Sequence, residues 1–145
     1  MREQLRLVER SSGRPVVDRL EVADGFWSRL VGFQLRSEPP PGFGLLLVPC
    51  SSIHTGFMRF PIDVFALNSD GRVVDVRHGV RPWRLVVPQR PTFAILEVAS
   101  GVGAGHLEVG ATLRLHVPAE NRRRISRRLT AWCESMMLAG GDRQG

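Results

Sequence analysis

Residues 62–77 read IDVFALNSDGRVVDVR, and this stretch decides the fold class. Two runs of strand length, Ile62 to Leu67 and Arg72 to Arg77, flank the turn sequence Asn68-Ser69-Asp70-Gly71. Asp70 and Gly71 tolerate the positive φ that a tight turn between antiparallel strands requires. The stretch therefore predicts a β-hairpin.

Further strands are predicted on both sides of this hairpin. Alternating apolar and polar residues predict strands at Gln4 to Glu9, Val16 to Val22 and Ala111 to Val117. The apolar run Gly44 to Val48 predicts a strand buried on both faces, and Thr92 to Val98 supplies another. Because 15 Gly and 10 Pro residues punctuate the chain, we expect about seven or eight short strands.

Two helices are predicted. Asp24 can cap a short helix that runs to Phe33, with apolar residues at helical spacing. Near the C-terminus, Ile125, Leu129, Trp132 and Met136 form an apolar stripe between Glu120 and Leu138. Such a stripe is typical of an amphipathic helix.

The 145 residues suit a single domain. Apolar residues make up 43% and charged residues 23%, which excludes wholesale disorder. Composition changes at Pro118, so we expect one β-rich domain over residues 1–117 and a basic helix and tail over residues 118–145. All 20 basic residues are Arg and Lys is absent, as in proteins coded by GC-rich bacterial genomes.

The formal net charge of +6 is divided equally between these two parts, although the second is much shorter. Arginines are dense on the C-terminal helix, at Arg122, Arg123, Arg124, Arg127 and Arg128. They form either a solvated helix face or a contact for nucleic acid or another anionic surface. Nucleic acid is the less favoured partner, because Trp132 lies on the apolar stripe and not among the arginines.

The cellular location can be predicted from three sequence features. The N-terminal residues contain no apolar leader segment. The longest nearly apolar run, Gly42 to Cys50, is too short to span a membrane. Cys50 and Cys133 lie in no CxxC motif, and a disulfide is not expected between them. We therefore expect a cytoplasmic protein without a membrane span.

Reactive side chains are densest in residues 50–63, CSSIHTGFMRFPID. Cys50, His54 and Asp63 are the three residue types that a Cys/His nucleophilic site needs. An extended chain would separate Cys50 from His54 by about 13 Å, so a turn would have to intervene. In the alternative interpretation Cys50 is a small buried side chain. These residues supply only three ligands in no standard spacing, so we expect no metal or other cofactor.

Two carboxylates stand inside apolar strands. Asp63 shares a strand face with Phe65 and Leu67, and Glu97 lies in the run Ala94 to Val98. A buried carboxylate must be paired or hydrogen-bonded. For Asp63, the expected partners are Arg59, Arg77 or backbone N–H groups, and two such carboxylates near one His would permit acid/base chemistry.

Trp83 stands between Arg81 and Arg84 just after the hairpin. This group could stack on a planar or anionic ligand. In the alternative interpretation, Trp83 closes one end of the core. The remaining histidines, His78, His106 and His116, are isolated in the sequence.

Several of these motifs together resemble the domain-of-unknown-function family 192. The resemblance is carried by Pro49-Cys50-x-Ser52-Ile53-His54-Thr55-x-x-Met58-Arg59-Phe60-Pro61-Ile62-Asp63-Val64-x-x-Leu67, then Asp70-Gly71-Arg72-Val73-Val74, Arg81-Pro82-Trp83-Arg84, Leu96-Glu97-x-x-x-Gly101 and Gly105-x-x-x-x-Gly110. It extends from about residue 16 to residue 117 and implies a mainly β, jelly-roll-like sandwich or barrel. The family has no established activity, and its members often carry an acidic residue where this chain has Ala111.

Three hypotheses follow for function. The first is a non-catalytic β-sandwich that binds a small ligand or a partner protein, with a site drawn from Cys50, His54, Thr55, Met58, Asp63, Trp83 and Glu97. The second is an enzyme that uses Cys50, His54 and Asp63. The third is binding of nucleic acid or an anionic surface through the arginines at 122–128.

Overall fold

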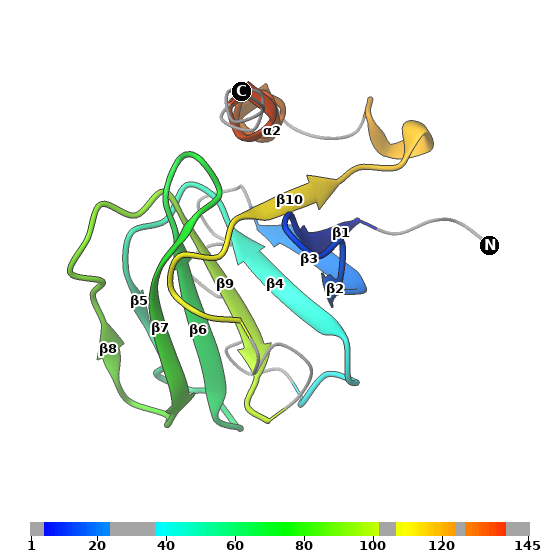
Figure 1. Cartoon of the computed structure of the whole chain (residues 1–145). Helices are drawn as coiled ribbons and strands as arrows, with labels where there is room; N and C mark the ends of the chain where they lie inside the picture. The colour runs from blue at the N-terminus through cyan, green and yellow to red at the C-terminus, as the bar shows by residue number, and fades with distance from the viewer. Residues whose placement is uncertain (1–4, 24–36, 102–106, 124–126, 139–145) are drawn as a thin grey trace.

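A computed structural model describes residues 5–23, 37–101, 107–123 and 127–138 (Figure 1). In this part of the chain, ten strands form sheets of five, three and two strands, and the sheets do not close into a barrel. The expected mainly β fold is confirmed. The helix predicted from Asp24 to Phe33 lies outside the described residues.

The five-stranded sheet is the centre of the molecule. Its strands, in spatial order, are β3 (Arg19–Ala23), β4 (Phe43–Leu47), β9 (Ala94–Ala99), β6 (Ile62–Leu67) and β7 (Val73–Val80). β3 and β4 are parallel, and the other neighbours are antiparallel. Every residue of β6 and β9 is buried, since both faces of the sheet are covered. The predicted hairpin is confirmed as β6 and β7.

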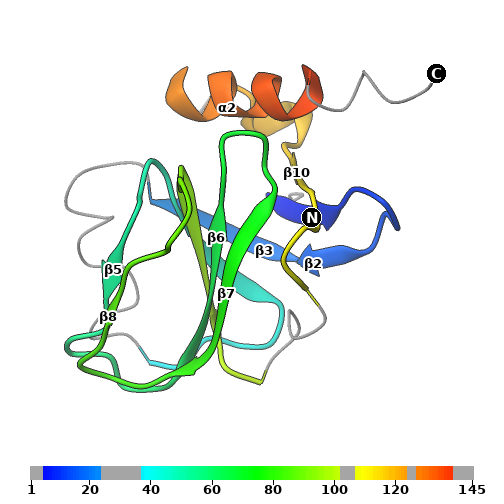
Figure 2. The ribbon, with the colours of Figure 1, turned by 60° about the vertical axis from the view of Figure 1, so that its left-hand side comes forward.

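One face of this sheet is covered by the three-stranded sheet and the C-terminal helix. The sheet contains β10 (Leu113–His116), β1 (Arg6–Glu9) and β2 (Pro15–Val17), in that order. The helix α2 (Arg127–Leu138) follows a short 3-10 turn, η1 (Ala119–Asn121). It crosses one end of the molecule above the β6–β7 turn (Figure 2). Leu129 and Trp132 of α2 join the core on this face, each 2% exposed.

The opposite face is covered by a small ribbon made of β5 (Ile53–His54) and β8 (Leu85–Val86). Ile53 and Val86 point inward, and Met58 and Phe60 from the segment after β5 add to the same core cluster. These side chains pack against residues of β4, β6 and β9. The central sheet is therefore the middle layer between two separate apolar cores.

The prediction of one strand from Val16 to Val22 is wrong. The structure has two strands there, because the chain leaves the three-stranded sheet at Asp18 and enters the central sheet. The amides of Asp18 and Arg19 both donate to the carbonyl oxygen of Gly42, at 2.9 and 3.1 Å. These hydrogen bonds fix the crossing point.

Among the described residues, no helix has the length and apolar character needed to cross a bilayer.

Candidate functional site

Asp63 is held by the neighbouring strand β7. The Asp63 side chain is buried, its Oδ1 accepts a hydrogen bond of 2.8 Å from the amide of Gly79, and its Oδ2 lies 3.4 Å from Nδ1 of His78. Both partners face Asp63 because β7 is bulged here, and Gly79 adopts a φ of 61°. The expectation of a backbone N–H partner is confirmed.

Arg77, another expected partner of Asp63, pairs instead with Asp75 on its own strand. The distance between Arg77 Nη2 and Asp75 Oδ2 is 3.4 Å. His78 was not a candidate on sequence grounds, because the contact depends on the extra residue in β7. No sequence periodicity reports that bulge.

Asp63 and Glu97 do not converge. Asp63 is opposite Val98 in the register of β6 and β9, and the next residue, Val64, is opposite Glu97. Successive residues of a strand point to opposite faces. Asp63 therefore shares a face with Phe65, toward the three-stranded sheet, whereas Glu97 faces the β5–β8 ribbon. The two carboxylates cannot act together on one ligand beside a single histidine.

Thr55 is part of the framework. It is 1% exposed, and its hydroxyl donates to the carbonyl oxygen of Arg81 at 2.6 Å while accepting from the amide of Arg84 at 2.8 Å. Its own amide donates to the Arg84 carbonyl at 2.8 Å, and its carbonyl accepts from the amide of Trp83 at 3.0 Å. One threonine thus fixes the loop that carries Trp83.

Met58 and Cys50 also lie away from an open site. Met58 is buried in the core beneath the ribbon. Cys50 is half-buried against the same core, and its thiol donates to the carbonyl oxygen of Ser52 at 3.2 Å. Cys133 packs against the core on the other face of the central sheet, so the two thiols are separated by that sheet. Burial raises the pKa of Cys133 to about 11.

Of the seven residues proposed for the ligand site, His54 and Trp83 are the two that are exposed, and the structure brings them together. Both border Gly56: a Cβ atom placed there would lie 3.3 Å from His54 Nδ1 and 3.5 Å from the Trp83 ring. Phe57 contacts Trp83 edge to face, with ring centroids 4.8 Å apart. Both aromatic residues have a left-handed backbone, with φ of 59° at Phe57 and 64° at Trp83.

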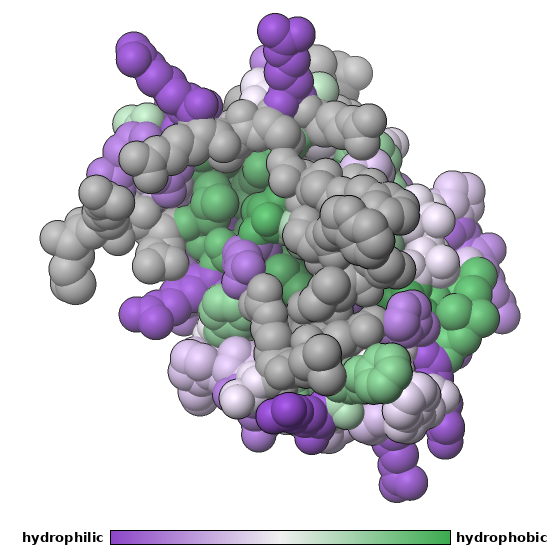
Figure 3. Space-filling view, turned by 180° about the vertical axis from the view of Figure 1, so that it is seen from behind, coloured by the Kyte–Doolittle hydropathy of each residue, from purple (hydrophilic) through white to green (hydrophobic). Residues whose placement is uncertain are grey.

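These aromatics belong to an exposed apolar surface, which we call the ribbon surface. It consists of Phe57, Trp83, Leu85 and Val87, with exposed fractions of 57, 66, 72 and 57%. Figure 3, a view from behind, shows apolar side chains at the right-hand edge of the molecule, the side on which β8 lies. The other large exposed apolar side chain of the described residues is Val109, outside the ribbon.

Basic side chains surround the ribbon surface. His54, Arg81 and Arg84 are exposed on the ribbon and its loop. A groove of about 510 Å³ between β7 and β8 adds Arg77 and His78 beside Leu85 and Val87. The sequence pointed to Trp83 and its flanking arginines but not to Phe57, Leu85 or Val87. The alternation of exposed Leu85, buried Val86 and exposed Val87 was too short a signal to predict a strand.

The described residues bear on two further kinds of site, a metal site and the arginine-rich C-terminal segment. Within them, no group of three His, Cys, Asp or Glu side chains is placed to hold a metal ion. On the C-terminal segment, Arg122, Arg123 and Arg127 are exposed, whereas Arg124 and the side chain of Arg128 lie outside the description.

Residues 7–115 match the model of the DUF192 family, described as "Uncharacterized ACR". The chain belongs to this family. The resemblance predicted from the sequence motifs is therefore confirmed. DUF192 is a family of uncharacterised function, so membership assigns no reaction and no ligand.

Named relatives agree with the DUF192 assignment. A UPF0127 protein of Pyrococcus furiosus is 36% identical over 110 residues, which cover 71% of this chain and 91% of the relative. A UPF0127 protein of Pyrococcus abyssi is 38% identical over 90 residues, or 58% of this chain and 74% of the relative.

A solved structure shows the same fold. The crystal structure of a Novosphingobium aromaticivorans protein of unknown function superposes with a TM-score of 0.66 at 22% identity, over 76% of this chain and 82% of that one. At this level of identity, the likeness concerns the fold alone.

Proposed function

We propose that this DUF192 domain is a non-catalytic binding module that recognises a partner protein through the ribbon surface. The observation that carries the proposal is the gathering of four exposed apolar side chains, Phe57, Trp83, Leu85 and Val87, on one small ribbon. Contiguous apolar side chains at a protein surface mark interaction sites more often than scattered ones do.

The backbone under the aromatic pair supports this proposal. A left-handed conformation costs a residue other than glycine about 1–2 kcal/mol. Phe57 and Trp83 both adopt it, and both side chains end in solvent, so burial of these rings does not offset the cost. Local strain of this kind is concentrated at functional sites. The pair is therefore best explained as a binding platform.

The surrounding charge indicates the chemistry of the partner. Arg81 and Arg84 flank Trp83, while His54 lies beside it and Arg77 lines the neighbouring groove. Trp and Arg are the residue types that contribute most to binding at protein interfaces. The expected partner segment presents apolar or aromatic side chains next to Asp or Glu.

A random peptide library selected on the intact domain tests the proposal. We expect the selected peptides to combine acidic with apolar residues. Trp83→Asn and Leu85→Thr should each weaken a selected peptide at least about tenfold, as loss of an interface anchor does. Asparagine tolerates a positive φ, so Trp83→Asn should fold normally.

Val109→Thr is the matched control, because Val109 is equally exposed but lies outside the ribbon surface. It should leave the affinity unchanged. Selection of no peptide would contradict the proposal, as would equal weakening by Val109→Thr or peptides rich in Arg.

The catalytic alternative has less support. The thiol of Cys50 donates a hydrogen bond to the carbonyl oxygen of Ser52. The carboxylate of Asp63 accepts a hydrogen bond from the Gly79 amide and lies beside His78. A Cys/His enzyme that uses Cys50, His54 and Asp63 stays a prediction without a favouring observation.

Other predictions also remain open to test. They are the jelly-roll relationship, the cytoplasmic location, the boundary between residues 117 and 118, and the amphipathic, basic character of the C-terminal segment with its contact to an anionic partner. The exposed Arg122, Arg123 and Arg127 support the last of these.

A further inference from the structure

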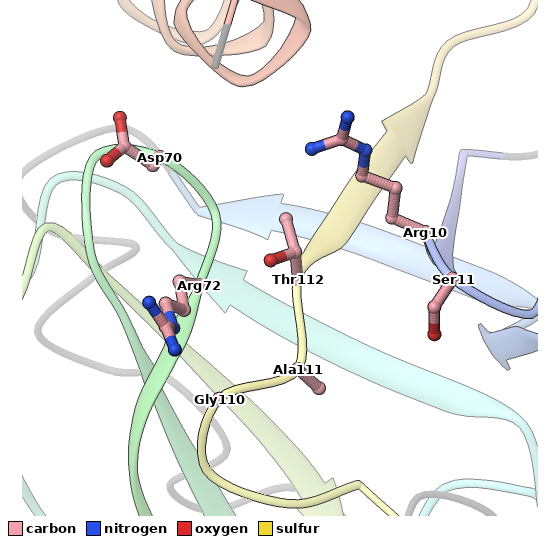
Figure 4. Close-up of a pocket in the computed structure, with 7 residues that line it drawn as sticks. All are labelled: Arg10, Ser11, Asp70, Arg72, Gly110, Ala111 and Thr112. Carbon is pink, nitrogen blue, oxygen red and sulfur yellow. The ribbon is translucent and has the colours of Figure 1, made fainter. Parts of the chain in front are cut away.

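A second site lies at the opposite end of β7, where three segments far apart in the sequence meet. The amide of Arg10 donates to the carbonyl oxygen of Thr112 at 2.8 Å, which extends the register of β1 and β10 by one residue. Arg72 forms an antiparallel bridge with the same threonine from the other side. Thr112 therefore lies between the two arginines (Figure 4).

The three side chains share one face of this short sheet extension. Residues directly opposite each other on antiparallel strands project to the same side, with Cβ atoms about 4.5–5.5 Å apart. The row Arg10, Thr112, Arg72 thus places two guanidinium groups on either side of one hydroxyl. Backbone hydrogen bonds of 2.8 Å from Val73 to Ala111 and from Leu113 to Gly71 hold this row in place.

The row lines a hollow of about 510 Å³. This volume is in the range of small-ligand sites, about 300–1,000 Å³. An anion in this hollow would lie among the positive charges of Arg10 and Arg72, which both line it. Among the described residues the Arg72 guanidinium has no ion pair, and Asp70, at the rim of the hollow, has none either.

We propose that Arg10, Thr112 and Arg72 bind the phosphoryl group of a small phosphorylated ligand. A guanidinium fork matches the oxygens of a phosphoryl group in geometry and charge, and the Thr112 hydroxyl can donate a further hydrogen bond. Gly110, which has a φ of 98°, borders the site: a Cβ there would be in ordinary contact with Arg72 Nη2, at 3.8 Å. This site is independent of the ribbon surface.

Calorimetric titration of the native protein with inorganic pyrophosphate tests the inference. We expect saturable binding, weakened at least about tenfold by Arg10→Gln and by Arg72→Gln, as loss of a charged hydrogen-bonding group would be. Thr112→Val should weaken it less. Asp70→Asn should tighten it, because the substitution removes the negative charge at the rim and keeps the shape of the turn residue.

Matched controls separate the site from general charge effects. Arg19→Gln removes an exposed arginine on β3, and Trp83→Asn removes the anchor of the ribbon surface. Both should bind pyrophosphate like the native protein. Absence of binding at millimolar pyrophosphate would overturn the inference, and so would equal weakening by Arg19→Gln. Binding of a single-stranded oligonucleotide through Arg10 and Arg72, without binding of pyrophosphate, would also overturn it.

Discussion

The amide of Trp83 donates a hydrogen bond of 3.0 Å to the carbonyl oxygen of Thr55. This bond joins the end of β5 to the loop before β8, which carries the exposed Trp83. Thr55 also holds Arg81 and Arg84 through its hydroxyl. Among the described residues, the most exposed aromatic side chain is therefore supported by one of the most buried polar ones.

Thr55→Val should loosen the ribbon. The substitution keeps the shape of the side chain but leaves the Arg84 amide and the Arg81 carbonyl without their hydroxyl partner. We expect the free energy of unfolding to fall by about 1–3 kcal/mol. Thr55→Ser keeps the hydroxyl and should lose less than half as much. Urea denaturation measures both, and equal losses would show that the methyl group, not the hydroxyl, matters.

Asp63 should stabilise the bulge of β7 mainly because its Oδ1 accepts a hydrogen bond, and less because the side chain is charged. Asp63→Ala removes the acceptor of the Gly79 amide and should cost about 1–3 kcal/mol in thermal or urea unfolding. Asp63→Asn keeps an acceptor for that amide and should cost clearly less. If the two variants were equally unstable, the charge facing His78 would be the stabilising element.

Trp132 should make α2 an integral part of the fold. Its side chain is 2% exposed and packs against Phe93, with ring centroids 5.8 Å apart. Trp132→Ala should reduce the free energy of unfolding by about 3–5 kcal/mol. In the described residues the indole N–H has no hydrogen-bond partner, so Trp132→Phe should cost much less.

The exposed Glu134 on the same helix supplies the control for Trp132. Glu134→Ala should change the free energy of unfolding little. A stable Trp132→Ala variant would mean that the helix contributes nothing to the core.

Cys133 should react slowly with alkylating reagents at neutral pH. Burial raises the pKa of its thiol from 9.0 to about 11, so little thiolate forms below that pH. In a Cys50→Ser variant, the rate of iodoacetamide modification should rise through pH 9 and level off only near pH 11. A plateau near the usual thiol pKa would contradict this.

The same shift should affect stability at high pH. The unfolded chain loses the Cys133 proton near pH 9 and the folded chain near pH 11, so the folded state binds more protons between these values. Stability should therefore decrease as the pH rises through this window, and Cys133→Ser should reduce the decrease. The effect should be modest, because the thiol is only half-buried.

The sequence predicted elements whose signal is local. The Asp70-Gly71 turn and the apolar runs around it were enough for the hairpin, and the stripe of Leu129 and Trp132 indicated a C-terminal helix. The sequence predicted one strand through Asp18 because this residue continues the alternation of Val16 and Leu20. In the structure, the chain passes from one sheet to the other at Asp18. Ile53–His54 and Leu85–Val86 are strands too short to show a period.

The candidate site was less predictable because it depends on register. Asp63 and Glu97 are similar in sequence setting, and a shift of one position in the pairing of β6 with β9 decides which face each occupies. The contact of Asp63 with His78 depends on a bulge, and the ribbon surface depends on a pairing between residues that are about thirty positions apart. The chemical types of the side chains pointed to the segment at residues 50–63, but they could not distinguish its buried residues from its exposed ones.

The pairing of β1 with β10 sets the order in which a newly made chain can fold. β1 can pair with β2 early, but Arg6 and Glu9 are opposite His116 and Leu113, so the other edge of β1 is completed only after β10 has been made. Pairings between distant segments form slowly, and exposed strand edges can pair with the wrong chain in the meantime. Leu7 is fully buried in the finished fold, but its partner Leu115 is made more than a hundred residues later, so this side chain stays incompletely covered during synthesis.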